Sequence, residues 1–477
     1  MTPKYFVSAF HSGLCRLLFA LFLGFLVSTS ASADVGSFGF GSRTASLAGA
    51  GAAWGSDAFS AYANPAALSD AAKKKLQLSY GWLFMDPSFK PIQGITIEND
   101  FTSDQVRTGD VVDDYRSLLG QTIGAAALLA PDWHHLTAGI TLFAPFDPLG
   151  AIDTGETYIP EYVLYRSRNQ RPLIELGLSG KITPRLSAGI GLHIGYAITA
   201  NGIAFLQTNT GTTSTMRVSA SLKPKTSPNF AWLWQSETAA SETGSWTLGQ
   251  VIRMPHDAQA TLSFSSGARA FGSLAALDLR FGASSALFYD PLSIETGFSW
   301  HHSPQKRLIL QLDFQNWANF ERPALQIAGQ DTCSKTNPGD PCSPLLVNPT
   351  TLPALNLRNT FTPRIAEEIQ FEKTTLRLGY SFHPSIFTKA PSGSGNYLDP
   401  DKHNASLGYG WKFPSFLGWN TPAALDVHGS YQFLVSQQVT KTANDEAGTA
   451  GKTKIGAPGY TAGGNLWGGG ATLTLEL

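Results

Sequence analysis

The sequence predicts an all-β fold: a transmembrane antiparallel β-barrel of about 14 strands, with an N-terminal hatch that plugs the lumen. Composition is the first observation, because charged residues are only 14% of the 477 residues, against about a quarter in a typical soluble protein. Second, mean hydropathy is −0.06, and the only long apolar run is N-terminal. Third, apolar residues alternate with small or polar ones in many short segments, as in outer-membrane strands.

Residues 1–33 have the pattern of a secretory signal peptide. Lys4 and Arg16 precede the apolar run 17–27, and a small-residue cleavage site ends at Ala33. The alternative is a membrane anchor, but the run is shorter than the roughly 20 apolar residues that a spanning helix needs. The chain is therefore expected to be exported.

Two cysteines remain once Cys15 leaves with the signal peptide. Cys333 and Cys342 lie in "CSKTNPGDPC", and in an exported chain a local disulfide is the expected state. A metal pair is the weaker alternative, because no His or further Cys lies beside them. No metal ion or other cofactor is expected.

Period-two alternation indicates the strands of the barrel, residues 75–477. In segment 185–199, Leu186, Ile190 and Ile194 share one face, while Gly189 and His193 share the other. The same pattern predicts fourteen wall strands near 75–84, 121–130, 135–144, 173–181, 185–199, 246–254, 259–265, 276–300, 307–317, 364–372, 374–382, 404–412, 423–434 and 466–477. Segment 276–300 is too long for one crossing of about 10 residues, so only part of it should cross.

The connections between these strands alternate in length. Bacterial barrels have short periplasmic turns and long extracellular loops, and brief connections such as "ITP", "PHDA" and "SPQK" alternate with long ones such as 85–120 and 200–245. This assigns the long connections to the outer surface. Segment 215–223 is expected to be an additional hairpin strand outside the wall.

Residues 34–74 are left unused by the strand pattern and are the expected hatch. Fourteen strands enclose a lumen too wide for the wall's own side chains, because roughly eight strands are already just filled. Gly and Ala allow close packing, and Asn64-Pro65 followed by Ala66 favours a turn that shapes the hatch. The alternative is a flexible linker, for which the aromatic residues of this segment are unusual.

Four stretches of the chain are informative when taken together: "NPAAL" in the hatch, "LILQLDFQNWANF", "TLRLGYSFHPS" and "YLDPDKHNASLGYGWKF". In this order they resemble the FadL/TodX-type outer-membrane transporters of long-chain fatty acids and other hydrophobic compounds. The resemblance implies a fourteen-stranded barrel in the outer membrane of a Gram-negative bacterium. It also implies uptake of an apolar ligand, hatch movement and sideways release into the membrane. His403 replaces an Arg common in the family's turn, and Leu477 replaces the usual terminal aromatic residue, which concerns recognition by the barrel-assembly machinery.

The candidate ligand-binding residues combine hatch aromatics with lumen-facing arginines. The aromatics are Phe38, Phe40, Trp54, Phe59 and Tyr62, and the alternative is that they only pack the hatch. Strand parity turns a set of charged and histidine side chains to the lumen: Glu175, His193, Asp278, Arg280, Glu295, His301, Arg307, Asp313, Arg377, Asp426 and His428. A stiffening salt-bridge network is the favoured interpretation, and a carboxylate-headgroup site with Arg307 or Arg377 is the sharper one.

Other function classes are disfavoured by the sequence. No Gly-x-Ser-x-Gly elbow is present, and the adjacent pairs His134-His135 and His301-His302 point to opposite faces of a strand, so catalysis is not expected. The net charge of −1 argues against nucleic-acid binding. Expected partners are hydrophobic small molecules, outer-membrane lipids and the assembly machinery, with the barrel as a monomer. A barrel that serves secretion or docks a protein partner is the alternative function.

Overall fold

The structure is a computed structural model of the chain. It describes residues 40–55, 57–71, 76–90, 92–98, 106–111, 115, 117–133, 135–146, 161–165, 171–207, 215–237, 242–269, 277–320, 326–333, 346–347, 355–389, 397–416, 421–440, 455–457 and 459–477. The expected signal peptide, Phe38, His134 and Cys342 lie outside these residues.

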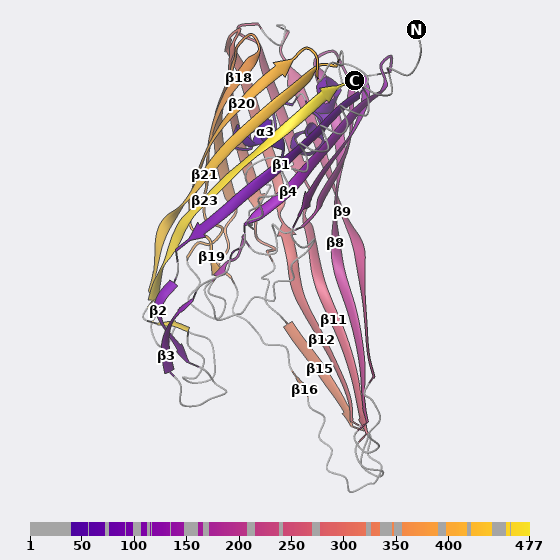
Figure 1. Cartoon of the computed structure of the whole chain (residues 1–477), viewed down its shortest axis with the longest axis vertical. Coiled ribbons are helices and arrows are strands. Elements are labelled where there is room, and N and C mark those ends of the chain that lie inside the picture. Colours follow the sequence, from indigo (N-terminus) through magenta and orange to yellow (C-terminus); the bar gives the residue numbers. More distant parts are fainter. Residues whose placement is uncertain are drawn as a thin grey trace, which may run out of the picture.

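Fourteen strands form a closed ring in which every neighbouring pair is antiparallel. In ring order they are β1 (Leu76–Phe89), β4 (Leu118–Ala130), β5 (Leu136–Pro145), β7 (Leu173–Lys181), β8 (Leu186–Gln207), β9 (Thr215–Gln235), β10 (Trp246–Arg253), β13 (Leu292–Ser303), β14 (Lys306–Asn316), β17 (Thr360–Gln370), β18 (Thr374–His383), β20 (Lys402–Phe413), β21 (Ala423–Thr440) and β23 (Gly459–Glu476). β1 pairs with β23 and closes the ring (Figure 1). The predicted barrel is therefore confirmed.

The outside of the ring is apolar. In β1, Leu78, Tyr80 and Trp82 are exposed, while Gln77 and Ser79, which point to the opposite face, are buried. The same alternation exposes Ile190, Phe298, Leu310, Leu378, Leu407 and Trp467 on other strands. A closed barrel leaves no unpaired edge and presents this apolar belt to lipid, so the ring spans a membrane.

Among the described residues, no helix is long and apolar enough to span a membrane.

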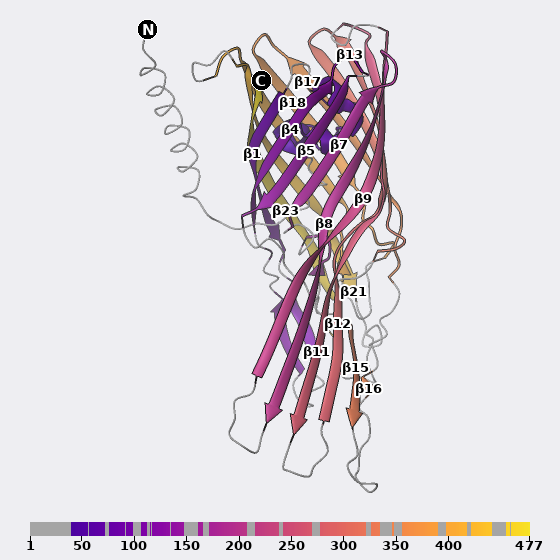
Figure 2. The ribbon, with the colours of Figure 1, turned by 90° about the vertical axis from the view of Figure 1, so that its right-hand side faces the viewer.

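The long-connection end of the barrel carries an extension made of strands. β11 (His256–Arg269), β12 (Leu277–Asp290), β15 (Gln326–Cys333) and β16 (Leu346–Val347) join the same sheet outside the ring. β11 pairs in parallel with the outer half of β8. Figures 1 and 2 show this extension projecting well beyond the barrel, with β8 and β9 forming part of it.

The predicted strand count was right because two errors cancelled. Segment 259–265 was expected in the wall, but it is β11 of the extension, and 276–300 is two strands, of which only β13 joins the ring. Segment 215–223 was expected outside the wall, but it is the outer part of wall strand β9. "PHDA" is consequently not a periplasmic turn, and much of 200–245 is strand. The outer part of β9 lacks a clear period-two alternation because it is an exposed edge of the sheet. It carries Lys and Pro, which protect an exposed edge from pairing with another chain.

Two small sheets lie among the long connections. β2 (Ile92–Glu98), β3 (Val106–Val111) and β22 (Ile455–Ala457) form one of them. In the other, β6 (Glu161–Tyr162) and β19 (Tyr397–Leu398) pair in parallel. This second pairing ties together two loop segments. Buried Tyr162 packs in an apolar cluster with wall residues such as Leu83, whereas buried Tyr397 packs in a cluster with Tyr289 of β12 and with Trp317.

In the described part of the hatch, four short helical elements lie within the lumen (Figure 1). They are α3 (Gly41–Ala45), α4 (Ser60–Ala63), η2 (Pro65–Ala67) and α5 (Leu68–Ala71). The Asn64 side chain caps η2 by accepting a hydrogen bond from Ala66 N at 2.9 Å, and it donates to the Ala52 carbonyl. Asn64 and Ala66 are fully buried, and Pro65 is buried too. These contacts hold the turn at residues 64–67, and a role of Asn64, Pro65 and Ala66 in shaping the hatch stays a prediction.

Small residues on the inner face of the wall let the hatch backbone approach. A Cβ at Gly189 would lie 2.4 Å from Ala66 N, and one at Gly249 would lie 2.1 Å from the Ala52 carbonyl oxygen. Hydrogen bonds then fix the hatch, because Ser406 Oγ accepts from Ala48 N at 2.8 Å. Gly189, which alternation places on the lumen face, and Gly249 of β10 are thus seats of the hatch.

Candidate functional site

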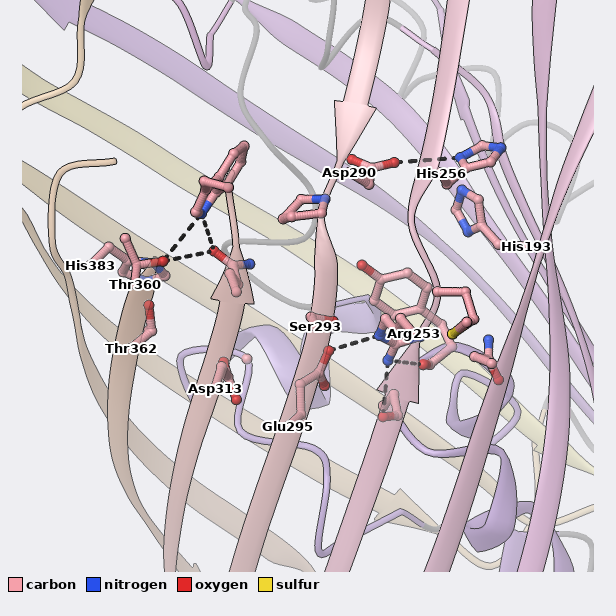
Figure 3. A pocket seen from close by; sticks show the side chains of 18 of the residues that line it. His193, Arg253, His256, Asp290, Ser293, Glu295, Asp313, Thr360, Thr362 and His383 are labelled. Carbon is pink, nitrogen blue, oxygen red and sulfur yellow. Dashed lines mark hydrogen bonds and ion pairs between the residues drawn. The ribbon is translucent and has the colours of Figure 1, made fainter. Parts of the chain in front are cut away.

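A cavity, called here the lumen cavity, lies in the barrel against the hatch. Its wall residues come from strands β7 to β20, Tyr62 comes from the hatch, and Leu164 and Ile386 come from loop segments. Figure 3 shows the charged and polar side chains that point into it. Apolar groups share the lining: Leu164, Leu173, Met254, Trp317 and Ile386. The cavity is therefore amphipathic.

Each lysine or arginine that lines the lumen cavity has a carboxylate partner. Three pairs join lining residues: Arg171 with Asp290 at 2.6 Å, Arg253 with Glu295 at 2.7 Å, and Arg364 with Asp313 at 2.6 Å. The fourth cation, Lys402, pairs with Asp399. An incoming anion would have to compete with these carboxylates for the cations.

A separate ion-pair network connects hatch and wall around the buried Glu368. Arg377 contacts its carboxylate at 2.8 Å, Arg43 of the hatch at 3.4 Å and Arg307 at 3.8 Å. Arg377 also pairs with Asp426 at 2.6 Å. Arg307 and Arg377 are not among the residues that line the lumen cavity. This arrangement corresponds to the stiffening network; a headgroup site at either arginine stays a prediction.

No protein-family model and no curated protein sequence matches the chain. Solved structures do match. A Pseudomonas aeruginosa FadL homologue aligns with a TM-score of 0.58 and 13% identity, covering 92% of this chain and 98% of that one. The toluene transporter TodX of P. putida aligns at 0.52 and 12% identity, with coverage of 92% and 98%, and the CymD monoaromatic hydrocarbon channel at 0.50 and 12%, with the same coverage.

The chain has the FadL/TodX-type fold. Barrels of this construction, closed and apolar outside, cross the outer membrane of Gram-negative bacteria. This chain is accordingly an outer-membrane barrel.

Within the FadL/TodX-type barrel, the predicted hatch aromatics occupy different surroundings. Phe40 packs between Phe59 and Tyr62, with ring centroids 5.7 and 5.1 Å away. The Trp54 ring lies under the Arg43 guanidinium at 3.8 Å and near that of Arg307 at 5.3 Å. Of the described aromatics predicted to bind ligand, Tyr62 lines the lumen cavity, where Arg253 lies 4.7 Å from its ring. Ligand contact by any of them stays a prediction.

Two other expectations fall partly outside the described chain. Cys333 ends β15 in the extension of the FadL/TodX-type barrel, but Cys342 lies beyond the described residues, so the disulfide is untested. The side chains of Asp278 and Arg280 are likewise not described.

The sequence did not reveal one cluster on the cavity wall of this FadL/TodX-type barrel. His193 of β8, His256 of β11 and Asp290 of β12 place their ligand atoms within 4.8 Å of one another. Strand parity predicted that His193 faces the lumen. The other two join it only because β11 crosses to the far side of β8, which no local pattern indicates.

Proposed function

We propose that this barrel carries hydrophobic small molecules across the outer membrane. It would bind them in the lumen cavity, move the hatch and release them sideways into the membrane. The observation that supports this most is the lumen cavity, an amphipathic site inside a plugged ring and lined by hatch and loop residues. The shared fold is consistent with it, because a toluene transporter and a monoaromatic hydrocarbon channel are built on the same plan.

The lining supports an apolar substrate class. Leu173, Met254 and Trp317 offer apolar contacts, and burying an apolar molecule gains about 0.8 kcal/mol per CH₂ group. The resemblance in sequence favours long-chain fatty acids. Because the cavity's cations are already paired, the ion pairs favour uncharged compounds such as arenes, and this is the second candidate class.

A sideways exit is proposed beside the cavity, where β8 changes its neighbour. β7 pairs with β8 as far as Ile194, and β11 pairs with it from Ile198 onward. Leu173 and His193, next to this change, line the lumen cavity. A molecule leaving here, at the outer edge of the apolar belt, would pass into lipid and keep the free energy of apolar burial that a watery path would forfeit.

Mass spectrometry of small molecules extracted from the purified barrel tests the proposed function. An unrelated barrel purified alongside is the control. Enriched fatty acids or enriched arenes would each support transport and identify the class. A lumen that stays empty after incubation with both would contradict it and favour the alternative, a barrel that docks a protein partner.

A substitution in the cavity ties the bound compound to this site. Met254→Glu places a carboxylate on the apolar lining, and we expect binding of the extracted compound to weaken on the order of tenfold, about 1.4 kcal/mol. Met254→Leu keeps the apolar volume and should bind like the original protein. Equal binding by the original protein and both variants would mean that the compound does not bind in the lumen cavity.

The remaining partners are part of the same proposal. The apolar belt would contact outer-membrane lipids, and the barrel-assembly machinery would insert the chain as a monomer. No catalytic step is proposed.

A further inference from the structure

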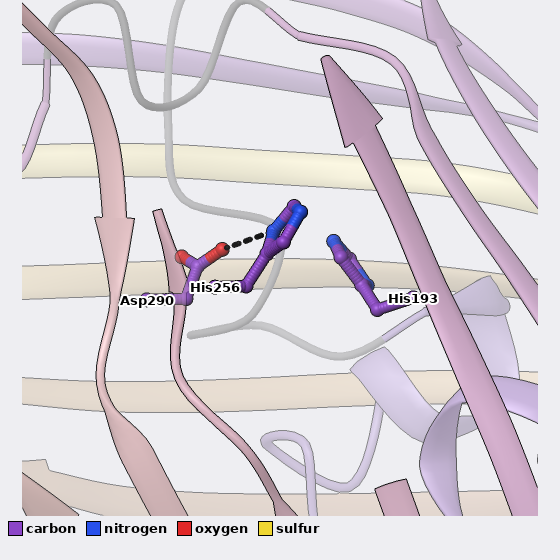
Figure 4. Close-up of side chains that lie close together, drawn as sticks. All are labelled: His193, His256 and Asp290. Atoms are coloured by element: carbon purple, nitrogen blue, oxygen red, sulfur yellow. Dashed lines mark ion pairs between the residues drawn. The ribbon is translucent and has the colours of Figure 1, made fainter. Parts of the chain in front are cut away.

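The His193, His256 and Asp290 cluster has the donor set of a metal site. Figure 4 shows the three side chains converging from separate strands. His256 Nδ1 lies 3.5 Å from Asp290 Oδ2, and the two imidazole centroids are 4.5 Å apart. Ligand atoms bound to one tetrahedral Zn²⁺ at 2.0–2.1 Å are about 3.4 Å apart. The cluster therefore needs only small side-chain rotations to close around an ion.

The hydrogen bond to Glu175 points the free nitrogen of His193 toward the cluster. His193 Nδ1 donates to Glu175 Oε2 at 2.8 Å, because a carboxylate can only accept. His193 Nε2 is buried and has no hydrogen-bond partner in the described part of the chain. A carboxylate behind a histidine in this way is the outer-shell partner common to metal-binding histidines.

His256 is held in the complementary tautomer. Its Nε2 donates to the Lys225 carbonyl at 3.2 Å, so the hydrogen sits on that nitrogen. Nδ1 then carries the lone pair and faces Asp290, and it is buried without a hydrogen-bond partner among the described residues. The imidazole is only 4% exposed. Two histidines thus present two unprotonated nitrogens to one carboxylate, and neither nitrogen has a hydrogen-bond partner in the part of the chain that the structure describes.

Charge around the cluster is compatible with a cation. Arg171 Nη2 contacts both Asp290 oxygens, at 2.8 and 2.6 Å, which opposes a second positive charge nearby. Glu175 and Asp290 together outweigh that arginine by one negative charge. Each carboxylate oxygen has two lone pairs, so Asp290 can keep its arginine and still offer a ligand. All three ligand residues line the lumen cavity, which gives an ion a route of entry.

We propose that His193, His256 and Asp290 form a binding site for a divalent transition metal, with Zn²⁺ the ion that the ligand set fits best. Two imidazoles and one carboxylate leave a fourth position open to water or to a ligand in the cavity. The bound ion would join β8, β11 and β12, and so fasten the extension to the wall. This metal site does not depend on whether the barrel is a transporter.

Zinc uptake by the full-length barrel without an affinity tag tests this site. The protein is stripped with EDTA in detergent and dialysed against Zn²⁺, and bound metal is counted by mass spectrometry. We expect one Zn²⁺ per chain, and at least about tenfold weaker binding in H193A and in H256A. Glu175→Gln should weaken binding 10–100-fold, the effect typical of outer-shell partners. The control is H428Q, because His428 is another lumen histidine whose ring nitrogens lack hydrogen-bond partners among the described residues, and it should bind normally.

Two readouts separate a lost ligand from a damaged fold. Circular dichroism of every variant reports the barrel, and Co²⁺ added to the original protein should give the intense visible bands of a tetrahedral site. Zn²⁺ should also raise the unfolding temperature of the original protein and of H428Q, but not of H193A. Absence of stoichiometric zinc in the original protein overturns the site, as does equal binding by H193A and H256A.

Discussion

Glycine decides how closely the hatch fits against the wall. At Gly189 the hatch backbone occupies the space that a side chain would need, with Ala66 N 2.4 Å and the Pro65 carbonyl carbon 2.5 Å from a Cβ. At Gly429 a Cβ would meet only the Gly468 carbonyl oxygen, 3.9 Å away. The same residue type therefore has different roles on different strands.

Gly189→Val is expected to displace the hatch turn while the ring stays closed. The new side chain overlaps backbone that cannot rotate away, and overpacking of this kind costs about 1–3 kcal/mol. Hydrogen exchange of hatch peptides from residues 57–71, measured by mass spectrometry, should become faster. Gly429→Val is the control and should leave exchange unchanged. Equal exchange in both variants would mean that Gly189 does not seat the hatch.

Single residues differ in how well the sequence predicts them. The lumen orientation of Glu175, His193 and Arg377 follows from parity along one strand, which is a local property. The partners of these side chains depend on register between strands. For that reason, the ion pair of Arg377 with Glu368 and the approach of His256 to His193 were not predictable.

At the scale of elements, the hatch contacts the wall through pairs of polar side chains. Replacing both members of a pair with cysteine would allow a disulfide, called here a lock, to fix the two elements together. Ser69 Oγ of α5 donates to Ser187 Oγ of β8 at 3.1 Å. Within the wall, Ser79 Oγ and Thr474 Oγ1 of β1 and β23 lie 2.9 Å apart. Cysteines at either pair have side chains close enough for a disulfide.

The hatch lock tests whether α5 must leave β8 during transport. We expect the oxidised Ser69→Cys, Ser187→Cys double variant to lose uptake of a hydrophobic substrate on the order of tenfold, and a reductant to restore it. The Ser79→Cys, Thr474→Cys pair cross-links two wall strands and should transport normally. Full uptake by the oxidised hatch lock would exclude movement of α5.

Elements were predictable where one face of a strand meets lipid and the other the lumen. The outer half of β9 meets neither, because it lies in the extension, and its exposed Lys223, Pro224 and Lys225 interrupt the alternation. The pairing of β10 with β13 could not be predicted from local patterns either. It joins residues that are distant in sequence, such as Trp246 and Trp300, because β11 and β12 lie between the two strands along the chain.

At the scale of the whole molecule, the apolar belt determines which part of the barrel tolerates charge. Leu407 of β20 and Leu222 of β9 are both exposed, at 52% and 68%. Leu407 lies mid-strand in the ring, whereas Leu222 pairs with Ile198 beyond the end of β7. Only the first is expected to face the lipid interior.

Leu407→Arg is expected to lower the free energy of unfolding by about 2–4 kcal/mol, the cost of arginine on a lipid face near the midplane. Leu222→Arg should cost about 0–1 kcal/mol, because charge is tolerated near and beyond the interface. Denaturant titration of both variants in lipid vesicles measures the difference. Similar losses would show that the belt extends to Leu222.

Pairing of β10 directly with β13 makes residues 254–291 an insertion within an otherwise complete ring. Arg253 lies opposite Ser293, so the wall already has all its neighbours on either side of that insertion. The ring can therefore close before the insertion folds, and the insertion can vary without reopening it. Met254, His256 and Asp290 all belong to this segment and line the lumen cavity. Substitutions in residues 254–291 can therefore change which molecules the cavity binds, while the wall strands that hold the barrel in the membrane stay the same.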